Sequence, residues 1–171
     1  MNLIKQTNFL KNLPKKLNQF YNKYSKTGFK VSNKSKTKKD FDPVTNIDRG
    51  FEKYIRSLIH KSFPKDSIIG EEFEDKYASN DYQWCIDPID GTRAFVIGAP
   101  TWSNLIGFSV NERSTIGLAN FPELNKYYLS DDKKSYVVKN FKKTTLKSSK
   151  NNNLKTIKIM GNFHGTLSYE K

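Results

Sequence analysis

The chain has 171 residues, of which 36% are hydrophobic and 13% aromatic. This composition supports one folded domain, or one and a fragment, and argues against a disordered chain. The formal charge is +13, from 30 Lys and Arg against 17 Asp and Glu, which favours anionic partners such as phosphorylated metabolites or nucleic acids.

A single cysteine, Cys85, excludes an internal disulfide and favours a reducing compartment. Because Cys85 lies in an apolar run, we expect it to pack in the core. No segment has transmembrane length or signal-peptide character, so we expect a soluble cytoplasmic protein.

Two amphipathic helices are predicted in the first part of the chain. Apolar and aromatic residues recur at helical spacing over 13–24, with Asn12 as the candidate cap and Gly28 as the stop. A second periodic segment predicts a helix from about Thr45 to Lys61. It places Asp48 in the first turn, where the helix dipole favours a carboxylate whatever its function.

The segment between these helices is short and rich in lysine. Residues 29–31 predict a short strand, and 32–39 form a polar segment that we interpret as a solvated surface loop. One of the lysines in this loop could nevertheless reach a phosphate group.

Strands dominate the rest of the sequence. Short apolar runs at 67–70 and 82–86 each end in acidic residues, and alternating runs predict an antiparallel meander from 102 to 138. Residues 142–153, rich in Lys, Ser and Asn, have the composition of a linker, and 154–160 predict the start of another strand. We therefore expect an α+β fold in which two helices pack on a largely antiparallel sheet.

The residues best suited to chemistry lie in the Asp-Pro-Ile-Asp-Gly-Thr turn that begins at Asp87. Asp87 would emerge at the carboxyl end of a buried strand. The following proline stiffens the turn, so that the Ile89 carbonyl and the carboxylates of Asp87 and Asp90 can converge on a hard cation such as Mg²⁺. Gly91 lets the backbone approach a ligand, and Thr92 begins a helix whose free N–H groups favour an anion. The same residues also suit a plain turn in which Asp90 caps that helix.

Two glutamates, Glu71 and Glu72, close the apolar run at 67–70 as Asp87 closes the run at 82–86. If these two strands are neighbours in a sheet, their ends would bring the carboxylates together. If they are not, the glutamates are ordinary surface charge.

With three acidic clusters in this order, the sequence resembles the inositol monophosphatase family, the Mg²⁺-dependent, lithium-sensitive sugar phosphatases. The matching motifs are Asp42-Pro43-Val44-Thr45-Asn46-Ile47-Asp48, Gly70-Glu71-Glu72 and Trp84-Cys85-Ile86-Asp87-Pro88-Ile89-Asp90-Gly91-Thr92. The residues that look most like the histidinol-phosphatase branch are Arg93-Ala94-Phe95 and Gly98-Ala99-Pro100-Thr101-Trp102. The resemblance implies hydrolysis of a small phosphate monoester, specifically histidinol phosphate to histidinol, in histidine biosynthesis.

Carried over residue by residue, the resemblance implies a site for two or three Mg²⁺ ions. Glu71, Asp87 and the Ile89 carbonyl would hold one ion, and Asp87 and Asp90 would hold a second. Phosphate monoester hydrolysis is among the slowest uncatalysed reactions. Paired metals can activate a bound water and stabilise both the attacking and the leaving oxygen.

The resemblance also implies residues that act on the water and the phosphate. Glu71 and Thr92 would position the attacking water, and Asp48 would orient the Thr92 hydroxyl. The amides of Gly91 and Thr92 would bind the phosphate, with Arg93 as a further substrate-binding residue.

One part of the family pattern has no match here. The family's second half carries a further aspartate, in a Trp-Asp motif, that completes the second metal site, and nothing after Asp132 matches it. We therefore expect the N-terminal half of the sugar-phosphatase fold, with a metal- and phosphate-site domain over 1–141. A linker and the truncated start of a second α/β domain would follow over 142–171. A complementary second-half chain or a homodimer is the corresponding partner expectation.

Other functions stay open at this point. The chain could act on an inositol phosphate or a nucleotide 3′-phosphate, or it could be a non-catalytic remnant or a basic protein that binds polyanions such as RNA. We favour a small phosphorylated metabolite over nucleic acid, because the lysines lie in polar segments without a recognisable nucleic-acid motif. We expect no membrane association.

Overall fold

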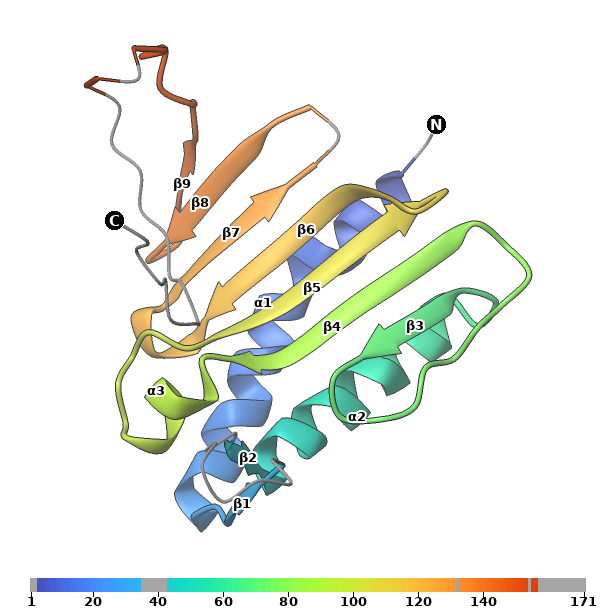
Figure 1. Cartoon of the computed structure of the whole chain (residues 1–171), viewed down its shortest axis with the longest axis vertical. Helices are drawn as coiled ribbons and strands as arrows, with labels where there is room; N and C mark the ends of the chain where they lie inside the picture. Colours follow the sequence, from blue (N-terminus) through green and yellow to red (C-terminus); the bar gives the residue numbers. More distant parts are fainter. Residues whose placement is uncertain (1–2, 35–42, 132, 154, 157–171) are drawn as a thin grey trace, which may run out of the picture.

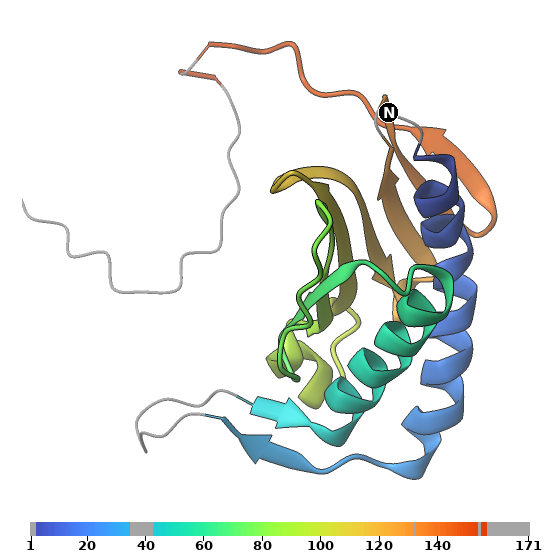
Figure 2. The same cartoon turned by 90° about the vertical axis from the view of Figure 1, so that its right-hand side faces the viewer.

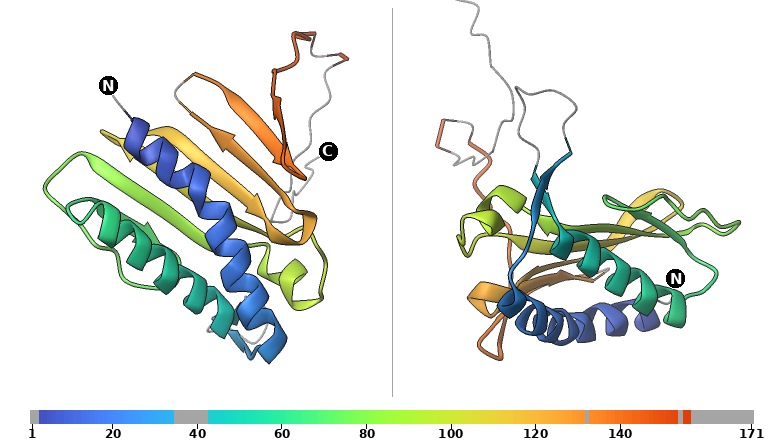
Figure 3. Two further views of the ribbon diagram at one scale, coloured as in Figure 1. Left: turned by 180° about the vertical axis from the view of Figure 1, so that it is seen from behind. Right: turned by 90° about the horizontal axis from the view of Figure 1, so that it is seen from below.

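Two long helices lie side by side on one face of a twisted sheet (Figure 1). This is a computed structural model, and it describes residues 3–34, 43–131, 133–153 and 155–156. Figure 3 shows from behind how both helices cross the same face of the sheet. The predicted α+β arrangement of two helices on a largely antiparallel sheet is therefore confirmed.

Helix α1 (Ile4–Tyr24) is longer than the sequence predicts. The prediction that it begins near residue 13 is wrong, because a stripe formed by Leu10, Leu13 and Leu17 is completely buried and carries the helix through Pro14. A proline inside a helix removes one backbone hydrogen bond and costs about 3 kcal/mol. Burial of this stripe against the sheet compensates for that local cost. A short 3₁₀ turn, η1 (Ser25–Thr27), follows the helix.

Helix α2 (Asn46–Ser62) confirms the second predicted helix. Thr45 caps it, and the side chain of Asp48 accepts a hydrogen bond from the backbone N–H of Thr45, which completes a reciprocal capping box. The two helices meet through aromatic rings: Phe20 of α1 lies 4.7 Å from Phe51 and 5.0 Å from Tyr54, measured between ring centroids.

The main sheet has seven strands that follow one another in sequence order. Only the first pair is parallel, and every later pair is antiparallel, as the predicted meander requires. The strands are β3 (Ser67–Gly70), β4 (Tyr82–Asp90), β5 (Ser103–Val110), β6 (Arg113–Phe121), β7 (Lys126–Ser130), β8 (Ser135–Lys139) and β9 (Lys142–Thr145). Two short helical segments lie between strands of this sheet: α3 (Thr92–Val96) between β4 and β5, and the 3₁₀ turn η2 (Pro122–Leu124) between β6 and β7.

Two predicted boundaries are wrong. Strand β4 continues to Asp90 instead of ending at Ile86, because Asp87 and Asp90 still pair with β5, on either side of an irregularity in the register. Strand β9 takes the first four residues of the segment predicted as a linker, and it pairs with β8 through Lys139↔Lys142 and three further residue pairs. The predicted strand at 154–160 lies almost wholly outside the described residues.

A separate two-stranded ribbon joins the helices. Strand β1 (Val31–Asn33) pairs antiparallel with β2 (Pro43–Thr45). Strand β1 lies two residues later than the strand predicted at 29–31. The ribbon leaves the helical layer and passes the end of the sheet near α3 (Figure 2, and the right-hand view of Figure 3). Residues 35–42, which include Asp42 and most of the predicted polar loop, lie outside the described part of the chain.

The two faces of the sheet differ in burial. Trp84 and Ile86 point to the helices and are buried, whereas Cys85 and Leu105 point to the opposite face and are only partly buried. The expectation that Cys85 packs in the core is therefore wrong, because alternation along β4 turns it away from the helices. None of the described helices is long and apolar enough to cross a membrane.

Candidate active site

The candidate site lies where the parallel strands β3 and β4 end. Gly70 pairs with Ile86 in the register, so the next residues, Glu71 and Asp87, leave the sheet side by side. Both line a shallow hollow of about 440 Å³ on the sheet face opposite the helices. The expectation that neighbouring strands bring these carboxylates together is confirmed.

The end of β4 is shaped by contacts with β5. The carbonyl oxygen of Pro88 accepts a hydrogen bond of 2.6 Å from Asn104 Nδ2, and Asp90 Oδ2 accepts one of 3.2 Å from Ser103 Oγ. Gly91 adopts the left-handed conformation, with φ 83°, and directly precedes α3. No side chain caps α3, so the interpretation of Asp90 as a helix cap is wrong.

A buried hydrogen-bond network connects this turn to α2. Thr92 Oγ1 lies 3.0 Å from the Ile89 carbonyl oxygen and 3.3 Å from Asp48 Oδ1. The other oxygen of Asp48, Oδ2, accepts hydrogen bonds from the backbone N–H and the hydroxyl of Thr45. Burial raises the pKa of Asp48, and its hydrogen bonds to Thr45 and Thr92 partly oppose this rise. The structure thus brings Asp48 and Thr92 together across 44 residues of sequence.

Asp87 lies in the least favourable electrostatic position of the site. Burial first, and then the charges of Glu71 and Asp90, raise the pKa of Asp87 from 3.8 to about 7. Asp87 Oδ1 is buried and has no hydrogen-bond partner among the described residues. A buried, unpartnered carboxylate oxygen beside two more carboxylates is destabilising unless a cation compensates for it.

The end of β3 is organised by charged residues from distant parts of the chain. Lys34 Nζ lies 2.9 Å from Glu71 Oε1 and also binds Glu72 Oε1. The backbone N–H of Glu72 donates a 2.7 Å hydrogen bond to Glu52 Oε2, while Glu52 Oε1 accepts one of 2.7 Å from Arg56 Nε. Burial raises the pKa of Glu72, although its bond to Lys34 lowers it.

Glycine is required at position 70 because the Glu52 side chain passes so close to it. A Cβ atom there would collide with the carboxylate of Glu52 and the guanidinium of Arg56. The Gly-Glu-Glu motif therefore combines a close approach of α2 with two carboxylates at the strand end.

The residues present fit a hard divalent cation. Carboxylate and carbonyl oxygens are the ligands that Mg²⁺ prefers, and the orphaned Asp87 Oδ1 is an oxygen that needs a positive partner. Glu71, Asp87, Asp90 and the Ile89 carbonyl could supply the ligands. Across the described residues, however, no three acidic, His or Cys side chains are already gathered in a metal-binding arrangement. Glu71 is held by Lys34 instead.

The sequence analysis missed two residues that contact the acidic residues at the end of β3. Glu52 is completely buried, and the available signal was a glutamate next to Phe51 on the apolar stripe of α2. Lys34 lies in the lysine-rich segment, but composition alone could not select it among its neighbours. Arg93 is exposed on α3, and its role as a substrate-binding residue stays a prediction.

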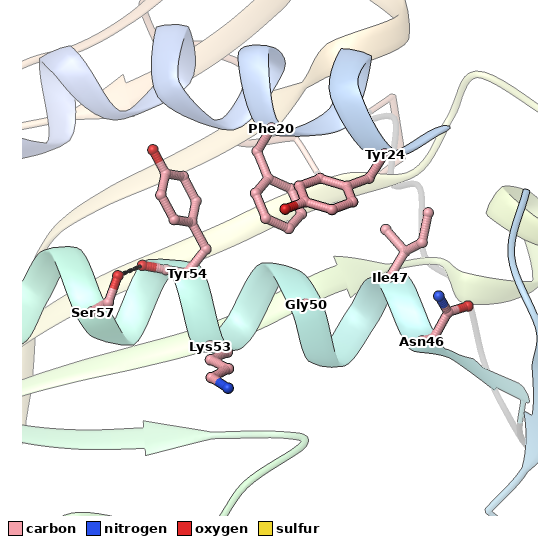
Figure 4. A pocket seen from close by; sticks show the side chains of 8 residues that line it. All are labelled: Phe20, Tyr24, Asn46, Ile47, Gly50, Lys53, Tyr54 and Ser57. Atoms are coloured by element: carbon pink, nitrogen blue, oxygen red, sulfur yellow. Dashed lines mark hydrogen bonds between the residues drawn. The ribbon is translucent and has the colours of Figure 1, made fainter. Parts of the chain in front are cut away.

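A second hollow, of about 430 Å³, lies between α1 and α2 (Figure 4). Phe20 and Tyr24 of α1 face Ile47 and Tyr54 of α2 across it, and Lys53 points away from α1. No acidic residue lines this hollow. It therefore lacks the chemistry of the site at the strand ends.

Fold and site together define an α+β protein with a carboxylate site suited to a hard cation. The chain belongs to the inositol monophosphatase family, whose family model matches residues 5–166.

Individual relatives agree with this assignment. A histidinol-phosphatase from Chlorobaculum parvum is 41% identical over 95 residues, 56% of this chain and 37% of that protein. The Nus factor SuhB of Haemophilus influenzae is also 41% identical, over 90 residues, 51% of this chain and 33% of that protein. A solved IMPase/NADP phosphatase complexed with Mg²⁺ and phosphate shares the fold, with a TM-score of 0.64 and 18% identity, over 74% of this chain and 49% of that chain. The matched segments thus span half or less of each relative.

Proposed function

We propose that this chain carries a Mg²⁺-dependent site for hydrolysis of a small phosphate monoester. The observation that carries the proposal is Asp87, a half-buried carboxylate with one buried oxygen that has no partner among the described residues, and with a pKa raised by burial and by two neighbouring acidic residues. Such an arrangement is unfavourable by itself, and a divalent cation would relieve it. An acidic site would also repel a phosphate ester unless cations were bound, so activity should depend strictly on the metal.

In this proposal Glu71, Asp87, Asp90 and the Ile89 carbonyl would hold two or three Mg²⁺ ions. Bound metal would lower the pKa of a water and stabilise charge on the attacking and leaving oxygens. The solved relative with Mg²⁺ and phosphate supports the choice of ion, although it does not establish the number bound here.

The protein's own residues would orient the water. Asp48 is fixed in the capping box of α2, so its Oδ1 can accept a hydrogen bond from the Thr92 hydroxyl and orient it. Thr92 Oγ1 would then accept a hydrogen bond from one O–H of the attacking water. A carboxylate oxygen of Glu71 would accept a hydrogen bond from the other O–H and take its proton as the water attacks. Gly91 and Thr92 amides, with Arg93, would bind the phosphate.

Histidinol phosphate is the substrate we propose. The similarity to a histidinol-phosphatase supports it, as does the Arg-Ala-Phe sequence that follows the Gly-Thr of the turn. Similarity at 33% identity to a protein named fructose-1,6-bisphosphatase/inositol-1-monophosphatase supports an inositol phosphate as the alternative substrate, and a nucleotide 3′-phosphate is the other alternative. Histidine biosynthesis in the cytoplasm would be the corresponding context.

Phosphate release tests the proposal. We would incubate the 171-residue chain with histidinol phosphate, inositol 1-phosphate or 3′-phosphoadenosine 5′-phosphate, each with Mg²⁺ and with EDTA. We expect Mg²⁺-dependent release that is fastest with histidinol phosphate. Equal turnover of inositol 1-phosphate would reject the substrate proposal alone, and release that persists in EDTA would reject the metal site.

A parallel assay tests the proposed partner. The chain covers 37% of the histidinol-phosphatase and 49% of the solved IMPase/NADP phosphatase reported above, so a polypeptide equivalent to the remaining part of such a relative is added. Release that rises sharply on this addition would support a complementary second-half chain. No change in rate would contradict that partner.

A further inference from the structure

We propose that Lys34 is an internal counter-ion that holds Glu71 in the metal-free protein and releases it to a divalent cation, while remaining paired with Glu72. The inference rests on the proposed function, because it concerns how that same carboxylate site accepts its metal. It assigns Lys34 the part of a positioning residue, which acts through the two glutamates.

The ammonium group bridges two carboxylates that differ in burial. Lys34 reaches the site from the end of β1, 37 residues before Glu71 in sequence. The side chain of Glu71 is 45% exposed, whereas that of Glu72 is only 2% exposed. A buried carboxylate depends on its cationic partner far more than an exposed one.

Glu72 is therefore the permanent partner of Lys34. The other nearby cation, Arg49, is 3.9 Å from Glu72 Oε2 and is itself 63% exposed, so it cannot replace a direct hydrogen bond. The backbone of Glu72 is also fixed by its hydrogen bond to the buried Glu52. Displacing Lys34 from Glu72 would leave a buried charge without a partner.

Glu71 is the exchangeable partner. It lies next to Asp87, whose buried oxygen lacks a partner among the described residues, and a divalent cation between the two would satisfy both carboxylates. The contact that must be given up is one half-exposed ion pair, which contributes little to stability because water screens it.

Direct metal binding tests the inference without an activity assay. We would titrate Mg²⁺ into the 171-residue chain by calorimetry and unfold the metal-free protein in urea with EDTA. Lys34→Met keeps the aliphatic length but removes the charge, so we expect Mg²⁺ to bind about two- to fivefold more tightly. The urea midpoint of the metal-free variant should fall, because Glu72 loses its partner. Added Mg²⁺ should restore only part of the lost urea midpoint.

Matched variants separate local from general charge effects. Lys61→Met removes the same charge at the other end of α2, about 20 Å from Asp48 by helical rise, and should change neither measurement. Lys34→Arg should keep the urea midpoint of the original chain. If Lys34→Met does not fold, the double variant Lys34→Met/Glu72→Gln removes the buried unpaired charge and should still bind Mg²⁺ more tightly.

The outcomes distinguish this inference from the proposed function. In one outcome the original chain binds Mg²⁺ and Asp87→Asn does not, while Lys34→Met binds Mg²⁺ no more tightly than the original chain. This outcome would overturn the role of Lys34 alone. Equal Mg²⁺ binding by the original chain and Asp87→Asn, or none by either, would contradict the proposed metal site and the inference together. If Lys34→Met lowered the urea midpoint without tighter Mg²⁺ binding, Lys34 would be purely structural, and the inference would also be overturned.

Discussion

The two acidic strand ends of the site are held in place by different interactions. At the end of β4, the polar contacts are hydrogen bonds to the adjoining strand and within the turn, such as Asn104 to Pro88 and Thr92 to Ile89. At the end of β3, Glu71 and Glu72 depend on ionic side chains from β1 and α2. The first end is therefore defined by backbone geometry, whereas the second depends on charge balance and can respond to an added cation.

The largest effect should come from the β4 end. Asp87→Asn keeps the shape of the side chain but removes the charge that metal ligation requires, so Mg²⁺-dependent phosphate release should fall more than about 100-fold. The metal-free protein should become more stable by about 1 kcal/mol at pH 8, because a half-buried and repelled carboxylate is lost. Activity assays and urea unfolding in EDTA measure the two effects.

The stability gain of Asp87→Asn should depend on pH. The folded-state pKa of Asp87 is raised from 3.8 to about 7, so the folded protein holds a proton that the unfolded chain loses between these two pH values. The stability cost of the carboxylate therefore grows as the pH rises from about 4 to about 7 and is fully present above 7. The gain should therefore be present at pH 8 and vanish near pH 4. A gain independent of pH would contradict the electrostatic explanation.

The next effect should appear at the β3 end. Glu52→Gln leaves Arg56 facing a neutral side chain and presents an amide N–H₂ to donors, so unfolding free energy should drop by about 2–3 kcal/mol. Urea denaturation would measure it. Glu74→Gln serves as the control, because Glu74 is an exposed glutamate in the loop after β3. It should change the unfolding free energy by less than about 0.5 kcal/mol. Similar losses for the two variants would remove the special role of buried charge at this end.

A smaller effect on rate is expected at Thr92. Thr92→Ala removes the hydroxyl near Asp48, so phosphate release at saturating substrate should fall about 10- to 100-fold with little change in stability. Thr92→Ser restores the hydroxyl and should recover most of the rate. If alanine and serine variants were equally slow, the methyl group and not the hydroxyl would be important.

The smallest effect is expected for Arg49, which approaches the same buried Glu72 as Lys34 does. Arg49→Met should change the unfolding free energy by less than about 0.5 kcal/mol and Mg²⁺ affinity by less than about twofold, because the pair is long and exposed. A calorimetric titration beside Lys34→Met gives the comparison. Equal effects of the two variants would show that Glu72 responds to total nearby charge and not to a specific partner.

Much of the site was predictable because its signals are local. The helix start that places Asp48 in its first turn, the strand that ends at Gly70, and the Asp-Pro-Ile-Asp-Gly-Thr turn all depend on residues within a few positions of each other. Alternating runs also predicted the meander. The early start of α1 was missed because Pro14 is a local signal against helix, and only burial of the neighbouring leucines overrides it.

The sequence by itself determined the chemistry of this protein: which residue types could hold a cation, the order in which they occur, and the secondary structure that carries most of them. Tertiary structure alone decided which charges meet. Lys34, Glu52 and Glu72 are brought together across 20 and 38 residues of sequence. Such pairings depend on how strands and helices pack, and neither spacing nor composition encodes them, because the Coulomb energy between two side chains depends on their separation in space.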